Sequence, residues 1–94
     1  MWEGVSVYFN FISGKACILG NVRITCSDTH LGIFAESFSN MECLEMLVAA
    51  LLKKELVKLQ FAGQEVDGII TYIDGGNDKC LTVNVAISSG ESNG

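Results

Sequence analysis

Apolar and polar side chains alternate along much of this chain, and the alternation predicts β-strands. The first such stretch is residues 5–12, where valine or phenylalanine stands at every second position from Val5 to Phe11. A period of two places these side chains on one face of a strand. The same kind of pattern predicts further strands at residues 16–27, 31–37, 57–61, 65–73 and 79–87.

Glycine and short polar residues mark the connections between these strands. Residues 13–15 and 62–64 each contain a glycine that can adopt a positive φ, as a turn requires. The run from Asp74 to Asp78 indicates a hairpin loop. Gly20-Asn21 interrupts the second strand and indicates either a β-bulge or a tight turn that divides the strand in two. Strands joined by such short connections pair antiparallel.

Between the third and fourth predicted strands the period changes to that of a helix, from Ser39 to about Lys54. Ser39 to Glu42 fits the capping box, in which a hydroxyl and a carboxylate each satisfy a free backbone N–H. Acidic residues come first and Lys53 and Lys54 come last, which matches the helix dipole. The apolar face is predicted to hold Met41, Leu44, Leu47, Val48, Leu51 and Leu52. The opposite face is predicted to hold Glu42, Glu45, Ala49 and Lys53.

The predicted order is therefore β-β-β-α-β-β-β, with one strand fewer if the first group holds only two. We expect an α+β fold in which a mainly antiparallel sheet of five to six strands packs on one central helix. A chain of 94 residues has room for one core, so residues 1–87 are expected to form a single domain. Residues 88–94 are small or polar, and we expect a disordered tail there.

The composition bears on the surface of this domain. Hydrophobic residues make up 49% of the chain and charged residues only 18%, against a usual charged share of about 25%. A surface so poor in charge favours burial against a homodimer mate or a permanent partner. The formal net charge of -5 argues against nucleic acid and against an acidic membrane. A partner protein with a basic surface suits this charge better.

Targeting signals and cysteine spacing indicate a compartment. The first residues lack the basic and apolar regions of a secretory signal. The longest strongly apolar run, residues 46–52, is too short to cross a bilayer. We therefore expect a cytoplasmic protein. In a reducing compartment the four cysteines are predicted to be buried free thiols, although their even number also permits two disulfides.

The residues that catalysis requires are scattered along the sequence. His30 is the one histidine, and no serine or cysteine motif accompanies it. The cysteines are too widely spaced for structural zinc, and no glycine-rich loop opens the helix. The loop from Asp74 to Asp78 lacks the spacing of a calcium loop. We therefore expect no metal, no cofactor and no enzymatic activity.

Three features exceed what folding alone requires, and each is a candidate for binding a partner. The first is the outer helix face around Glu42, Glu45 and Met46, where flexible or small apolar residues stand beside charges. The alternative is that the helix packs on both sides within its own domain.

The second feature is a set of aromatic residues with polar atoms, a type enriched at interfaces, although cross-strand packing is the favoured explanation. They are Trp2, Tyr8 and Tyr72. The third feature is a group of acidic residues around one hairpin, which can form a negative surface or simply face solvent. They are Glu65, Asp67, Asp74 and Asp78.

Small size, acidity and the expected lack of catalysis favour a protein that binds and inhibits another macromolecule. In type it is similar to phage anti-CRISPR inhibitors and to immunity proteins that neutralise bacterial toxins, but no motif assigns it to either. Acidic inhibitors of this kind occupy sites built for nucleic acid. Two alternatives are a module that binds a small molecule such as a nucleotide signal, and a structural subunit of an assembly.

Overall fold

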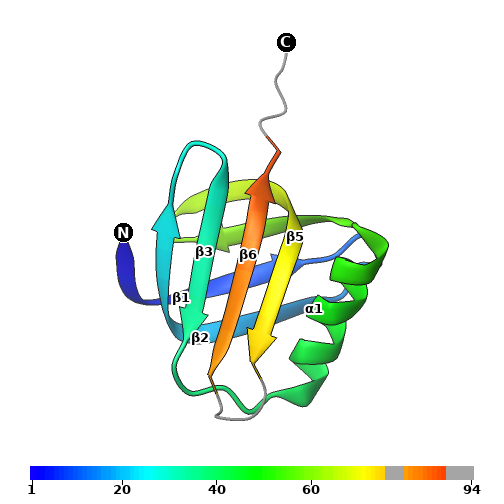
Figure 1. The fold of residues 1–94 in the computed structure, drawn as a ribbon, viewed down its shortest axis with the longest axis horizontal. Helices are drawn as coiled ribbons and strands as arrows, with labels where there is room; N and C mark the ends of the chain where they lie inside the picture. The colour runs from blue at the N-terminus through cyan, green and yellow to red at the C-terminus, as the bar shows by residue number, and fades with distance from the viewer. Residues whose placement is uncertain (76–79, 89–94) are drawn as a thin grey trace.

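Six strands form a closed barrel with one helix at its side (Figure 1). The computed structural model describes residues 1–75 and 80–88. The elements in chain order are β1 (Trp2–Asn10), β2 (Ala16–Cys26), β3 (His30–Ala35), α1 (Met41–Lys53), β4 (Leu56–Phe61), β5 (Gln64–Gly75) and β6 (Leu81–Ile87). The predicted order β-β-β-α-β-β-β is therefore confirmed, with three strands in the first group. The predicted tail at 88–94 lies, apart from Ser88, outside the described residues.

The sheet closes on itself, which the sequence did not predict. The strands follow the order β1-β2-β3-β6-β5-β4, and β4 returns to pair with β1. Every pairing is antiparallel, as the short connections predicted. Closure depends on the pairing of Tyr8–Asn10 with Lys58–Gln60, here called the β1–β4 seam. Local alternation carries no information about such a distant pairing, so an open sheet was the simpler expectation.

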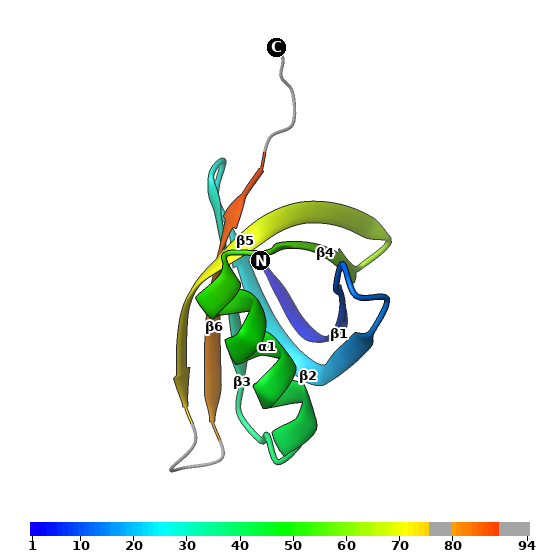
Figure 2. The same cartoon turned by 90° about the vertical axis from the view of Figure 1, so that its right-hand side faces the viewer.

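The two long strands, β2 and β5, bend so that each takes part in both sides of the barrel (Figure 2). β5 pairs with β4 up to Ile69 and with β6 from Gly68 onward. Between the pairs Val5↔Val22 and Val7↔Leu19, β2 carries one residue more than β1, and Asn21 there has a φ of 56°. Of the two alternatives predicted for Gly20-Asn21, the bulge is therefore confirmed, because the strand continues through it.

The interior of the barrel is filled with apolar side chains. Inward residues alternate with outward ones along each strand, so Val7, Phe9 and Phe11 are buried in and just after β1, as predicted. Among the described residues no polar or charged side chain is buried. The largest fully buried side chains are Phe9, Ile24, Leu31, Ile33, Leu47, Leu59, Ile70 and Leu81. A ligand must therefore bind on the outside of this barrel.

The helix begins one residue later than the predicted capping box requires. Its N-cap is Asn40, whose side-chain Oδ1 accepts a hydrogen bond from the Cys43 backbone N–H at 3.0 Å. The prediction of a Ser39 cap was wrong because Asn40 is an equally good cap and lies directly before the first helical turn. Lys54 ends the helix in the left-handed conformation, and its N–H bonds back to the last turn.

The buried face of α1 also differs from the predicted one. The face centres on Cys43, Leu47 and Ala50, and the helix packs on β5 and β2 instead of covering one face of a sheet. Met41 and Leu52, predicted to be buried, are 62% and 77% exposed. Apolar residues lie on several sides of the helix. The side with the small residues Cys43 and Ala50 can approach the strands more closely. In the described part of the chain, no helix has the length and apolar character needed to cross a membrane.

Candidate partner-binding surface

The predicted helix patch is only partly on the surface. Glu42 and Glu45 are exposed on the outer side of α1. Met46 is half-buried and packs against the core, so it contributes little to an outer surface. The large exposed apolar residues on this helix are instead Met41 and Leu52, and Ala49 is also exposed. The role of the acidic pair in binding stays a prediction.

The predicted acidic residues do not form one cluster. Glu65 and Asp67 lie exposed at the start of β5, paired with Gln60 and Lys58 of β4. Asp74 lies near the other end of this twelve-residue strand. Asp78 falls outside the described residues. Any negative surface around Glu65 is therefore separate from Asp74.

The three aromatic residues divide into one that packs and two that are exposed. Trp2 is half-buried and meets the Phe61 ring edge-on, with 5.3 Å between ring centroids, which is the packing alternative. Tyr8 and Tyr72 are 49% and 48% exposed. They lie on opposite sides of the barrel, Tyr8 on β1 and Tyr72 on the second half of β5. We name the two outer surfaces after them.

The Tyr8 face consists of outward side chains from β1, β2, β4 and the start of β5. Tyr8 stands at its middle, between Ile18 of β2 and Gln60 of β4, its direct cross-strand neighbours. Ile18 is also exposed, which gives the tyrosine ring an apolar neighbour. The members of this face are Ser6, Tyr8, Asn10, Ile18, Lys58, Gln60, Glu65 and Asp67.

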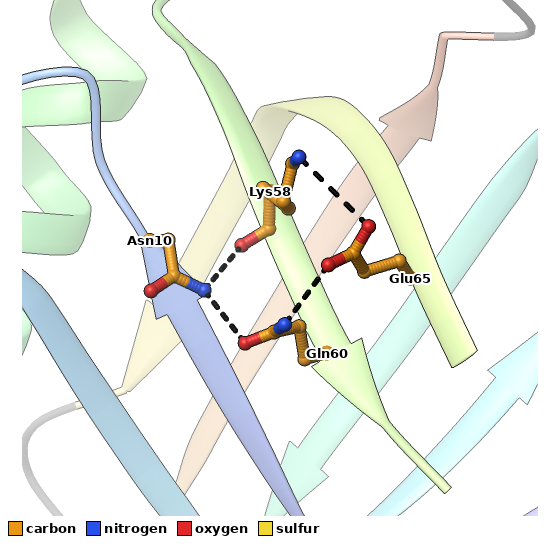
Figure 3. A network of polar contacts seen from close by, with 4 residues as sticks. All are labelled: Asn10, Lys58, Gln60 and Glu65. Carbon is orange, nitrogen blue, oxygen red and sulfur yellow. Dashed lines mark hydrogen bonds and ion pairs between the residues drawn. The ribbon is translucent and has the colours of Figure 1, made fainter. Parts of the chain in front are cut away.

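A polar network crosses the β1–β4 seam beside Tyr8 (Figure 3). The Asn10 amide donates to the Lys58 carbonyl at 3.4 Å and to Gln60 Oε1 at 3.1 Å. The Gln60 amide donates in turn to Glu65 Oε2 at 3.0 Å. Lys58 Nζ lies 3.8 Å from Glu65 Oε1. The network holds the Glu65 carboxylate in a defined position, although none of these groups is fully buried.

An open groove of about 630 Å³ lies along this face, next to the turn that joins β4 and β5. Ala62 and Gly63 form the turn with φ values of 48° and 75°, which brings the chain back sharply beside Tyr8. Glu65 is the one charged side chain among the residues that line the groove. The lining residues are Ser6, Tyr8, Gln60, Phe61, Ala62, Gly63, Gln64 and Glu65.

The Tyr72 face lies on β3, β6 and the adjoining halves of β2 and β5, and Figure 1 shows these strands in front. Tyr72 pairs with Asn84, which pairs with Gly32 of β3. A second open groove, of about 520 Å³, borders this face and includes Asn84, Gly32 and His30 in its lining, but neither Tyr72 nor any carboxylate. The members of this face are Arg23, Thr25, Gly32, Phe34, Tyr72, Thr82 and Asn84.

The cysteines are all free thiols. Cys17 and Cys43 are buried as predicted, whereas Cys26 is exposed and Cys80 half-buried, so the prediction was wrong for these two. The pKa of the Cys17 thiol is raised by its hydrogen bond to Cys43 and by burial. These effects keep Cys17 protonated and unreactive.

Three groups of reactive type, Cys26, Ser27 and His30, line the second groove together, and the His30 backbone N–H donates to the Ser27 hydroxyl at 3.1 Å. His30 is exposed, and its Nδ1 lies 2.8 Å from the Thr29 hydroxyl. Within residues 1–75 and 80–88, no three His, Cys, Asp or Glu side chains gather closely enough to hold a metal ion.

Searches against protein-family models, curated proteins and solved structures found no match to this chain.

The sequence did not identify most of the Tyr8 face. Asn10, Ile18, Lys58 and Gln60 are ordinary polar or apolar strand residues that meet only through pairing between distant strands. Three members carried a signal: Tyr8 was an aromatic residue in the polar phase of its strand, and Glu65 and Asp67 belonged to the predicted acidic group.

Proposed function

We propose that this protein is a non-catalytic inhibitor that binds another protein through the Tyr8 face. One observation carries the proposal: a half-exposed tyrosine lies between an exposed isoleucine and polar side chains that are already held in place. Tyrosines in such surroundings are common energetic centres of interfaces. Because the polar groups are ordered before binding, less conformational entropy is lost when a partner arrives.

The shape of the molecule supports a macromolecular partner over a small ligand. The barrel interior is packed with apolar side chains, and the grooves beside Tyr8 and beside Asn84 are open and lie on the outer faces. Small ligands are usually held in concave sites that bury most of their surface. A shallow surface with a central aromatic residue suits a protein partner better.

The charge supports a partner with a basic site. The chain carries a net charge of -5, and the groove beside Tyr8 contains a single charge, which is negative. Complementary charge speeds association and excludes wrong partners. An inhibitor of the anti-CRISPR or toxin-immunity type, which occupies a basic nucleic-acid site, has these properties.

Tagged co-purification with matched variants tests this proposal. Wild-type protein and Tyr72→Ala should retain one stoichiometric protein from a suitable host lysate, and Tyr8→Ala should lose it. The purified partner should have an activity that wild-type protein inhibits and Tyr8→Ala does not. Equal retention by the two variants, or no effect on the partner's activity, would contradict the proposal.

We also propose that the protein forms a homodimer through a different surface, the outer side of α1. Met41 and Leu52 are large, apolar and mostly exposed there. Light scattering across a concentration series should show a dimer that Leu52→Glu dissociates. A wild-type protein that stays monomeric at the highest soluble concentration would exclude it.

A further inference from the structure

We infer that the groove beside Tyr8 is a recognition site for one arginine side chain of the partner. Its guanidinium would lie on the Tyr8 ring and pair with the Glu65 carboxylate. This inference rests on the proposed function, because it names the group that the Tyr8 face recognises. The groove is bordered by an aromatic ring and contains a single carboxylate, and a guanidinium group can interact with both.

The Glu65 carboxylate is positioned yet still able to accept hydrogen bonds. Gln60 donates to Oε2 at 3.0 Å, and Lys58 lies at the longer distance of 3.8 Å from Oε1. An ionised carboxylate has about four acceptor sites, so these two contacts leave room for a bidentate partner. Lys58 is not among the residues that line the groove, but its Nζ already pairs with Oε1, so an arginine must share the carboxylate with Lys58 or displace it.

Tyr8 supplies the second half of the site. Its ring is about half exposed and borders the same groove as Glu65. A guanidinium that lies over a tyrosine ring is attracted by the negative face of the ring. A planar guanidinium can stack on the ring and direct its N–H groups sideways to the carboxylate, whereas a lysine ammonium is compact and strongly hydrated.

The remaining lining residues fit the other donors of a guanidinium. Ser6 and Gln64 carry side-chain oxygens, and the turn at Ala62 and Gly63 exposes backbone near the groove. Arginine has five N–H donors and no acceptor, so a groove with several acceptors and one negative charge matches it. The groove on the Tyr72 face has no carboxylate in its lining and serves as an internal comparison.

A titration followed by NMR of the labelled full chain tests this site directly. The probes are N-acetyl-arginine amide, its lysine counterpart, and the citrulline amide, which has the shape of arginine without the charge. We expect saturable shifts at Ser6, Tyr8, Gln64 and Glu65 with the arginine probe. The lysine probe should bind several-fold more weakly, and citrulline should cause no saturable shift.

Two pairs of matched variants locate the binding. Glu65→Gln should weaken the arginine probe by about tenfold, as expected for loss of a charge-assisted bidentate contact. Asp74→Asn makes the same charge change near the other end of β5, outside the groove lining and the Tyr8 face, and should change the affinity less than about twofold. Tyr8→Ala should weaken binding by about fivefold, and Tyr72→Ala should not. Unchanged backbone spectra far from the site show that each variant is folded.

Two results would overturn the inference. One is a shift pattern that is the same for arginine and citrulline probes, and the other is an equal loss of affinity in Glu65→Gln and Asp74→Asn. Neither result affects the proposed function, because a partner can depend on Tyr8 without inserting an arginine. A partner that binds Tyr8→Ala as tightly as wild type contradicts the proposed function whatever the probes show.

Discussion

The Tyr8 and Tyr72 faces carry equally exposed tyrosines on one barrel, yet their surroundings differ. Tyr8 has an exposed isoleucine on one side and a hydrogen-bonded network on the other. Tyr72 stands opposite Asn84 and does not border the groove on its face, whose lining includes His30 and Cys26 but no carboxylate. Exposure of an aromatic ring therefore does not identify a binding site. The ordered polar groups and the charge around the ring make the two faces unequal.

The largest expected effect is on stability, and it concerns Gly68, where β5 bends from the Tyr8 face to the Tyr72 face. At Gly68 an added Cβ would lie 2.5 Å from Val85 Cγ1 and 2.7 Å from the Ala86 carbonyl oxygen. Gly68→Ala should lower the free energy of unfolding by about 3 kcal/mol, because the backbone neighbour cannot move aside. Urea denaturation measures this value.

Gly20→Ala is the control for Gly68→Ala. Its nearest neighbour would be the Ser6 hydroxyl at 3.8 Å, so its stability should stay within about 0.5 kcal/mol of wild type. If Gly68→Ala is as stable as Gly20→Ala, close packing at the bend of β5 does not contribute to the stability of the barrel.

The second effect is the difference between the two tyrosine variants in their affinity for the purified partner. Tyr8→Ala should weaken partner binding by about 2 kcal/mol, or roughly thirtyfold, as expected of an energetic centre. Tyr72→Ala should change it by less than about 0.5 kcal/mol, because peripheral contacts contribute little. Calorimetry on the purified complex measures both. A larger loss with Tyr72→Ala would reverse the assignment of the faces.

A smaller effect concerns two half-buried asparagines, one on each face. Asn10→Ala removes two hydrogen bonds across the β1–β4 seam and should cost about 1 kcal/mol of stability. Asn84 provides its backbone carbonyl to the Thr71 hydroxyl, a contact that Asn84→Ala keeps, so its cost should be under about 0.5 kcal/mol. Equal costs in thermal unfolding would show that the network does not stabilise the seam.

The smallest effect concerns the ion pairs, again one on each side. Arg23 lies 3.5 Å from Glu3, and Lys58 lies 3.8 Å from Glu65. Exposed pairs of this kind contribute little, so Lys58→Gln should cost under about 0.3 kcal/mol. Arg23 also lies over the Phe34 ring at 5.9 Å, which should raise the cost of Arg23→Gln to about 0.5 kcal/mol. Chemical denaturation in low salt resolves the order, and a larger cost for Lys58→Gln would contradict it.

Features that depend on neighbours along the chain were predicted well. The alternation in β1 and β6, the turn at Gly63 and the antiparallel pairing follow from residues close in sequence. The helix was predicted, but its cap was not, since Ser39 and Asn40 are nearly equivalent caps. Its buried face was predicted in part: Leu47 is buried, whereas Met41 and Leu52 are exposed. Only packing on β2 and β5 selects among the apolar sides of α1.

Features that depend on distant strands were missed. Asn10 and Gln60 are 50 residues apart, and nothing in either segment indicates that they meet. The acidic residues were grouped because they are near in sequence, but an extended strand places Glu65 and Asp74 far apart. The candidate site is thus a product of barrel closure, which alternation does not encode.

Closure at the β1–β4 seam also links recognition to folding. Tyr8, Asn10 and Gln60 come together only when the two ends of a long segment meet, a step that is slow and entropically costly. A chain that has formed its hairpins without closing the seam would present no arranged carboxylate beside Tyr8. A partner that recognises the Tyr8 face therefore selects completely folded molecules, and by binding them it holds the barrel shut.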